Sequence, residues 1–263
     1  WRVYLMHSVF CFKRFKVRQE SSSMKVNTDA VLLGAWAGMP CGREGFCFLD
    51  IGTGTGVIAL MIAQRLSDLK LNFKAIAIDP DHSSINESAF NFANSPWTDS
   101  LLAKEMTLEE FMLMEKGDCF DIIVTNPPFF TNSLKSSSLR KSSSRHNDIL
   151  PFSTIVKASE YLLKQDGKLS LILPEEERLN FMSEINKAAV ASAPSLFLTR
   201  ICQVKTLPCK EVKRVLMEFT KLPADKSVID IGGIIREELC IYKNDSSMKS
   251  PEYERLVNDF YLE

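Results

Sequence analysis

The sequence has 263 residues, of which 45% are hydrophobic and 25% are charged, a balance typical of an ordinary globular protein. The formal net charge of −1 excludes a polycation, so any contact with nucleic acid must come from a local basic patch. No hydrophobic run approaches the roughly 20 residues that a membrane-spanning helix needs, so we expect a protein outside the membrane.

The first regular pattern along the chain is a strand, a glycine-rich turn and a helix. Residues 46–51 form a short hydrophobic run that includes Asp50, and Gly52-Thr53-Gly54-Thr55-Gly56 follows directly. Residues 57–66 then place hydrophobic side chains at helical spacing. This order of elements is typical of a ligand-binding turn at the end of a buried strand.

Strands and helices alternate along the rest of the chain. The further expected strands are residues 73–78, 101–103, 120–125, 168–173, 197–204 and 212–220, with one more short candidate at 239–242. The expected helices are residues 81–94, 108–114, 152–163, 175–191 and 250–261, and Gly167 ends the third of them. This alternation predicts an α/β fold with a mostly parallel, seven-stranded sheet and helices on both faces. No linker divides the chain, so we expect one domain over residues 1–263.

The glycine turn is the first candidate binding site. Glycines let the backbone turn tightly and approach a ligand, and the helix that follows offers free N–H groups. The spacing G-x-G-x-G differs from the G-x-G-x-x-G dinucleotide fingerprint, and Asp50 suits the ammonium of a methionine moiety. Asp79 follows the next strand, where a carboxylate can accept both ribose hydroxyls. The pattern favours S-adenosylmethionine over an incidental turn, with Asp50, Gly52, Gly54, Gly56 and Asp79 as cofactor-binding residues.

Residues 120–125 run directly into Asn126-Pro127-Pro128-Phe129, the most specific feature of the sequence. Two prolines fix the backbone, so the Asn126 side chain and the Pro127 carbonyl offer two acceptors in set directions. Two acceptors on an exocyclic amino group would draw its nitrogen toward tetrahedral geometry, and Phe129 could stack on a flipped base. We expect amino-group methylation with Asn126, Pro127 and Phe129 as catalytic residues and Asn126 also beside the cofactor. The loop alone leaves adenine, cytosine and glutamine open.

Several segments, together with the N-P-P-F loop, resemble the bacterial tRNA1(Val) (adenine(37)-N6)-methyltransferase family. These segments are residues 10–15, 24–29, 32–36, 59–65, 95–97, 145–147 and 259–262. They span nearly the whole chain. The resemblance implies a class I, Rossmann-like methyltransferase core at 46–263 and methylation of the adenine just 3′ of the anticodon in one valine tRNA.

The resemblance also implies a place for the N-terminal extension, residues 1–45, near the cofactor site. Residues 24–29 would lie beside the methionine end of the cofactor, with Lys25 and Asp29 as polar contacts. One position departs from the family pattern, because Thr107 stands where an acid would read the adenine amino group of the cofactor. Glu105 and Glu109 are the neighbouring candidates to replace that acid.

Residues 131–147 follow the catalytic loop and carry four basic side chains and no acid. A basic loop at this place would contact phosphates and add a salt-dependent contribution to RNA affinity. The predicted RNA contacts are Lys135, Arg140, Lys141 and Arg145. The alternative is an ordinary solvated, serine-rich loop. A second basic group, Lys205, Lys210, Lys213 and Arg214, is equally compatible with the usual lysines of surface strands.

Cysteines and histidines give no pattern of a metal site or a disulfide framework. The seven cysteines are scattered without a C-x-x-C pair, and the three histidines lack metal-ligand spacing. We therefore expect reduced thiols in a cytoplasmic protein that binds no metal.

Other functions with related chemistry remain open from the sequence. They are adenine-N6 methylation of another RNA or of DNA, and N5 methylation of a protein glutamine. Glutamine enzymes usually have Tyr where Phe129 stands, and DNA enzymes usually carry a separate recognition domain. A non-catalytic cofactor-binding or RNA-chaperone protein would have no need of an intact Asn126-Pro127-Pro128.

Overall fold

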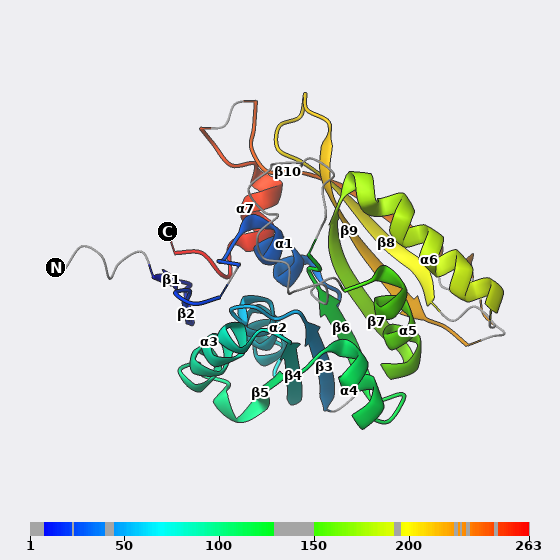
Figure 1. Ribbon diagram of the computed structural model, residues 1–263. Coiled ribbons are helices and arrows are strands. Elements are labelled where there is room, and N and C mark those ends of the chain that lie inside the picture. The colour runs from blue at the N-terminus through cyan, green and yellow to red at the C-terminus, as the bar shows by residue number, and fades with distance from the viewer. Residues whose placement is uncertain are drawn as a thin grey trace, which may run out of the picture.

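A mixed eight-stranded sheet runs through the computed structural model, which describes residues 8–22, 24–39, 45–128, 150–191, 196–223, 226, 228–229, 232–244 and 247–262 (Figure 1). Its strands are β3 (Phe46–Ile51), β4 (Phe73–Asp79), β5 (Leu101–Glu105), β6 (Phe120–Thr125), β7 (Leu163–Pro174), β8 (Leu196–Lys205), β9 (Val212–Lys221) and β10 (Ile235–Cys240). The order across the sheet is β10-β8-β9-β7-β6-β3-β4-β5. Only β9 runs antiparallel to its neighbours within this sheet. The mostly parallel sheet is confirmed, and β10, which overlaps the short candidate at 239–242, makes the sheet eight-stranded where seven strands were expected.

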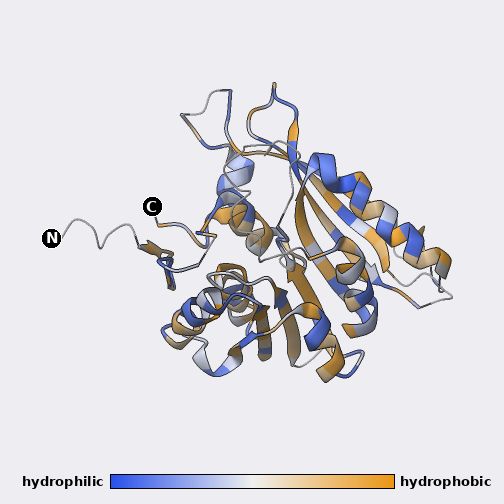
Figure 2. Cartoon of the chain, in the orientation of Figure 1, coloured by the Kyte–Doolittle hydropathy of each residue, from blue (hydrophilic) through white to orange (hydrophobic). Residues whose placement is uncertain are grey.

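Helices cover both faces of the sheet. They are α1 (Thr28–Trp36), α2 (Val57–Asp68), α3 (His82–Ala93), α4 (Leu108–Met114), α5 (Phe152–Leu162), α6 (Arg178–Ala191) and α7 (Pro251–Val257). One hydrophobic core contains side chains of α1, α2 and α7, and a second contains side chains of α4, α5 and α6. Phe48 of β3 belongs to the first core and Leu49 to the second, as alternation along a strand requires. The central strands are therefore hydrophobic on both faces, as Figure 2 shows.

The N-terminal segment forms elements that the sequence analysis did not assign. Strands β1 (Val9–Cys11) and β2 (Lys16–Arg18) make a separate antiparallel hairpin, and α1 follows. The rings of Phe12 and Phe15 stack at 4.6 Å, and Tyr261 stacks on Phe12 at 6.0 Å, so the two ends of the described chain pack together (Figure 1). Helix α1 is buried on all sides, so its sequence shows no amphipathic period.

The clearest difference from the expected elements lies between α5 and β7. Helix α5 ends at Leu162 and strand β7 includes Gly167, so the expectation that Gly167 ends the helix is wrong. A Cβ at this glycine would lie 2.7 Å from the carbonyl oxygen of Lys164, so close packing requires glycine here. Asp166, with φ of 63°, makes a left-handed turn just before it. Within the described residues, no helix is long and hydrophobic enough to span a membrane.

Glu218 of β9 is a buried carboxylate that ties the end of α1 to the middle of the sheet. It is 3% exposed. Its Oε2 accepts from the Gly38 backbone N–H at 2.7 Å and from Ser170 Oγ at 3.2 Å. Its Oε1 pairs with Lys168 Nζ at 3.0 Å. The residues after α1 are thus fixed to β7 and β9 by charge-assisted hydrogen bonds.

Two more ion pairs hold α1 against the same half of the sheet. The Arg200 guanidinium lies 4.2 Å from the Trp36 ring centroid and binds both carboxylate oxygens of Glu237, at 2.9 and 3.0 Å. Trp36 Nε1 donates to the same Glu237 at 2.7 Å. At the start of the helix, Arg214 Nε donates to Asp29 Oδ2 at 2.7 Å. Both ends of α1 are therefore anchored to β8, β9 and β10.

Replacing Glu218 with glutamine should destabilise the fold. We expect Glu218→Gln to lower the free energy of unfolding by roughly 1.5–3 kcal/mol, because a charged acceptor is lost from buried donors. The matched control Glu238→Gln removes the partner of Lys205 at an exposed site, and it should cost less than about 1 kcal/mol. Urea unfolding of the three proteins measures both values. Equal losses in the two variants would show that Glu218 is not an anchor.

Candidate active site

A cavity of about 560 Å³ opens at the carboxyl ends of the central parallel strands. The glycine turn after β3, the end of β4 and the start of α4 line one part of it. The segment before α1 and the loop after β6 line the rest. Ligands of open α/β sheets bind at this edge, and the volume suits a small organic cofactor.

The glycine turn contributes differently at its three glycines. Gly52 and Gly54 line the cavity, with φ of 69° and 53°. Gly56, with φ of 81°, is the N-cap of α2. A Cβ at Gly56 would lie 2.6 Å from Cε1 of Phe92, so this glycine allows α2 to pack against α3. The structure thus places two of the three predicted glycines at the cavity and the third behind them.

Asp50 lies behind the turn and does not line the cavity. It is fully buried, and its Oδ2 accepts from Thr53 Oγ1 at 2.7 Å. Its Oδ1 has no hydrogen-bond partner among the described residues. Burial raises the pKa of Asp50 to about 7, opposed by the Thr53 hydrogen bond. The structure therefore places this carboxylate under the turn, where we had expected a direct contact with an ammonium.

Asp79 ends β4 and lines the cavity, the position predicted for a ribose-binding carboxylate. Its Oδ2 accepts from the Gly54 N–H at 3.0 Å, and its Oδ1 accepts from the Asp81 N–H at 2.9 Å. Burial raises the pKa of this carboxyl, and the two backbone donors oppose the rise. Each oxygen keeps lone-pair capacity for a further donor, so two hydroxyls can bind side by side.

Asn126 lines the cavity and has a side-chain oxygen without a partner among the described residues. The residue is 9% exposed and lines the cavity directly after β6. Its Oδ1 is buried and finds no hydrogen-bond partner in the described part of the chain. Its Nδ2 faces Met24 Sδ at 4.0 Å. Pro127 is buried and Pro128 lines the cavity. A buried amide oxygen without a partner is costly, and a donor bound in the cavity beside Asn126 would satisfy it.

The segment before α1 lines part of the cavity, and only one of its lining residues was predicted from the sequence. Lys25 lines the cavity as expected. Asp29 does not line it, because its carboxylate pairs with Arg214. Met24 and Asn27 do line it, and Asn27 is also the N-cap of α1, with Oδ1 accepting from the Ala30 N–H at 2.9 Å. An N-cap signal before residues 28–36 could have placed Asn27 at a helix start.

The start of α4 contains an acid that can replace the one expected from the family pattern at position 107. Thr107 is the N-cap of α4 and forms a capping box with Glu110. Thr107 and Glu109 line the cavity. Glu105 does not line it, and its carboxylate Oε2 lies 2.6 Å from His82 Nδ1. Glu109 is therefore the acid at this part of the cavity.

Some predicted site residues cannot be placed. Phe129 and the basic residues Lys135, Arg140, Lys141 and Arg145 lie outside the described residues. Of the second basic group, Lys205 pairs with Glu238 at 2.9 Å, and Arg214 pairs with Asp29. Lys210 and Lys213 are exposed. The described residues contain no cluster of His, Cys, Asp and Glu that could hold a metal ion.

Comparison with known proteins gives the family. The sequence model of the "Methyltransferase small domain" matches residues 43–192. A protein of Flavobacterium psychrophilum named tRNA1(Val) (adenine(37)-N6)-methyltransferase is 35% identical over 97% of this chain and 99% of its own length. The chain belongs to this family. The extent of the match means that its members share the N-terminal segment as well as the core.

Solved structures with low sequence identity share the fold of this family member. A predicted O-methyltransferase of Agrobacterium tumefaciens superposes with a TM-score of 0.65 at 14% identity, covering 88% of this chain and 96% of that one. A structure from Listeria monocytogenes, titled as a class I S-adenosylmethionine-dependent methyltransferase, gives a TM-score of 0.54 at 14% identity and covers 87% and 66%. The fold is that of the class I methyltransferases.

The buried Asp50 should make stability depend on pH. Its pKa in the folded chain is raised above the unfolded value, so the stability present at low pH is lost as pH rises through about 7. Asparagine cannot ionise but can still accept from Thr53. We expect Asp50→Asn to melt progressively higher than the wild type as pH rises from about 4 to 7, with no further gain above that pH. The exposed control Asp99→Asn should follow the wild type, and a constant difference for Asp50→Asn would contradict the prediction.

Proposed function

We propose that this chain methylates N6 of an adenine in tRNA, that the adenine is number 37 of tRNA1(Val), and that the methyl donor is S-adenosylmethionine. The observation that carries the proposal is the buried Oδ1 of Asn126, without a partner among the described residues, on a cavity that Asp79 and the glycine turn also line. Membership of the family supports the choice of base and RNA, since the match covers nearly the full length of both chains.

The residues around the cavity fit the three parts of this cofactor. Asp79 would accept the ribose hydroxyls, while Gly52 and Gly54 let the backbone approach the sulfur end. Lys25 and Asn27 also line the cavity, and they would be the polar partners of the methionine carboxylate and ammonium. Asp50 would hold the turn through its hydrogen bond with Thr53, and Gly56 and Asp29 would shape the site by packing and ion pairing behind it.

Asn126 performs the polarising step. When bound, S-adenosylmethionine supplies a methyl group on a positively charged sulfur. Asn126 Oδ1 would accept one hydrogen of the adenine amino group, and the Pro127 carbonyl would accept the other. Neither proline has a backbone N–H, so these two residues offer no donor that competes for these oxygens. Holding both hydrogens exposes the nitrogen lone pair, so catalysis rests on orientation and polarisation.

The RNA partner would account for the aromatic and basic residues that follow Pro128 in the sequence. Phe129 would stack on the flipped adenine, and Lys135, Arg140, Lys141 and Arg145 would bind phosphates beside it. We place the reaction in the cytoplasm, where tRNA is modified. The cysteines within the described ranges are free thiols, as in reducing compartments.

Asn126→Ala tests the catalytic assignment. Loss of one polarising hydrogen bond should lower kcat by roughly 100-fold to 1,000-fold. Binding of S-adenosylhomocysteine should stay close to wild type, because the side chain acts on the substrate. The assay uses labelled S-adenosylmethionine with unmodified tRNA1(Val), followed by nucleoside digestion to detect N6-methyladenosine. The exposed Asn94→Ala is the control.

The same assay separates the related functions. A tRNA1(Val) with guanosine in place of adenosine 37 should accept no label. Label on another adenosine, on DNA or on a protein glutamine would identify one of the related substrates and refute the proposed one. An unchanged rate for Asn126→Ala would refute the role of the loop.

Glu109 should read the adenine amino group of the cofactor. We expect Glu109→Ala to weaken binding of S-adenosylhomocysteine by about 10-fold, the effect of losing one hydrogen bond to a charged group. Glu105→Ala is the matched control and should bind as the wild type does. S-inosylhomocysteine lacks the amino group, so it should bind the wild type and Glu109→Ala equally well in calorimetry. A preserved preference for the adenine form in Glu109→Ala would exclude this contact.

A further inference from the structure

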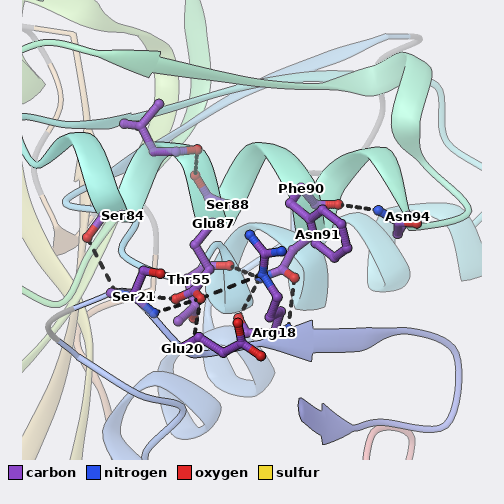
Figure 3. Close-up of polar contacts among 12 residues, drawn as sticks. Arg18, Glu20, Ser21, Thr55, Ser84, Glu87, Ser88, Phe90, Asn91 and Asn94 are labelled. Carbon is purple, nitrogen blue, oxygen red and sulfur yellow. Dashed lines mark hydrogen bonds and ion pairs between the residues drawn. The ribbon is translucent and has the colours of Figure 1, made fainter. Parts of the chain in front are cut away.

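Glu87 of α3 is a fully buried carboxylate outside the cavity, and it binds three successive backbone N–H groups of the N-terminal segment (Figure 3). Its Oε1 accepts from Glu20 at 2.6 Å and from Ser21 at 3.0 Å. Its Oε2 accepts from Ser22 at 2.9 Å. An ionised carboxylate only accepts hydrogen bonds, so it suits a site made of donors alone.

Asn91, one helical turn further along α3, links the same segment to the glycine turn. Its Oδ1 accepts from the Arg18 N–H at 2.8 Å, and its Nδ2 donates to the Arg18 carbonyl at 2.9 Å. Nδ2 also donates to the carbonyl of Thr55 at 2.8 Å. Figure 3 shows Glu87 and Asn91 extending from α3 toward the strand that carries Arg18. One buried amide thus joins β2 to the turn that lines the cavity.

The backbone held by Glu87 leads directly into residues that line the cavity. Residues 19–22 and 24–27 lie in neither a helix nor a strand, so side-chain contacts fix their position. Ser22 Oγ donates to the Met24 carbonyl at 3.2 Å. Met24 in turn faces the Asn126 amide nitrogen at 4.0 Å. A shift at residues 20–22 would therefore reach the catalytic loop.

We propose that Glu87 and Asn91 are positioning residues that hold residues 24–27 against the cofactor, so that cofactor affinity depends on two side chains that never touch it. The inference rests on the proposed function for the identity of the ligand. Helix α3 then has a role beyond packing. The buried acid stabilises one conformation of the segment, and the amide fixes the distance between that segment and the glycine turn.

Glu87→Gln tests this role, because the amide brings an N–H donor to a site made only of N–H donors. We expect the dissociation constant of S-adenosylhomocysteine to rise by at least about 10-fold in calorimetry. Amides of residues 19–27 should exchange hydrogen faster, while those of β6 and β7 should keep wild-type protection. The exposed Glu254→Gln on α7 is the matched control and should change neither quantity.

Asn91→Asp is the second variant, since it keeps the acceptor and loses both donated hydrogen bonds. It should show the same local exchange and weaker binding, and both variants should raise the KM for the cofactor more than they lower kcat. Faster exchange with unchanged affinity, or weaker binding with loss of protection throughout the sheet, would overturn the inference. Failure of the wild type to bind S-adenosylhomocysteine would refute the proposed function. Equal binding by the wild type and both variants would refute only the positioning role of Glu87 and Asn91.

Discussion

Parallel pairing of β3 with both β4 and β6 is the constraint on which the site depends. Ile51 lies opposite Ile78 on one side and opposite Thr125 on the other. Because the three strands end in register, the glycine turn, Asp79 and Asn126 meet at one edge of the sheet. The hydrogen bond from Thr125 Oγ1 to the Ile51 carbonyl, at 3.0 Å, reinforces this alignment where the catalytic loop begins.

The N-terminal segment completes the site because it is held at both ends by buried or half-buried charges. Glu87 fixes the backbone before residues 24–27, and Arg214, Glu218 and the Arg200–Glu237 pair fix α1 after them. Carboxylates that only accept and guanidinium groups that only donate leave few alternative pairings. A short stretch without helix or strand can therefore line a cavity in a defined position.

The parts of the fold that follow local periodicity could be predicted from the sequence. The strands that end at the glycine turn, at Asp79 and at Asn126 were found because hydrophobic runs and the residues after them are adjacent in the chain. The pairing of Asp29 with Arg214 joins residues 185 positions apart, and no local pattern records it. The expected cofactor contacts of Asp29 and Asp50 rested on residue type, whereas the structure sets them behind the cavity. Hairpin β1–β2 and the all-round buried α1 carry too little periodicity to be assigned.

The anchoring of the N-terminal segment sets an order of assembly during synthesis on the ribosome. Residues 18–22 leave the ribosome before their partners on α3, which come 65 to 73 positions later. The hydrogen bond of Trp36 cannot form until Glu237, 201 positions later, has been made. The N-terminal segment therefore settles after it has been made, because closing such long loops must await its distant partners. A nascent chain that stops before β10 would have the glycine turn and the N-P-P-F loop, but its helix α1 would lack the anchor at Glu237.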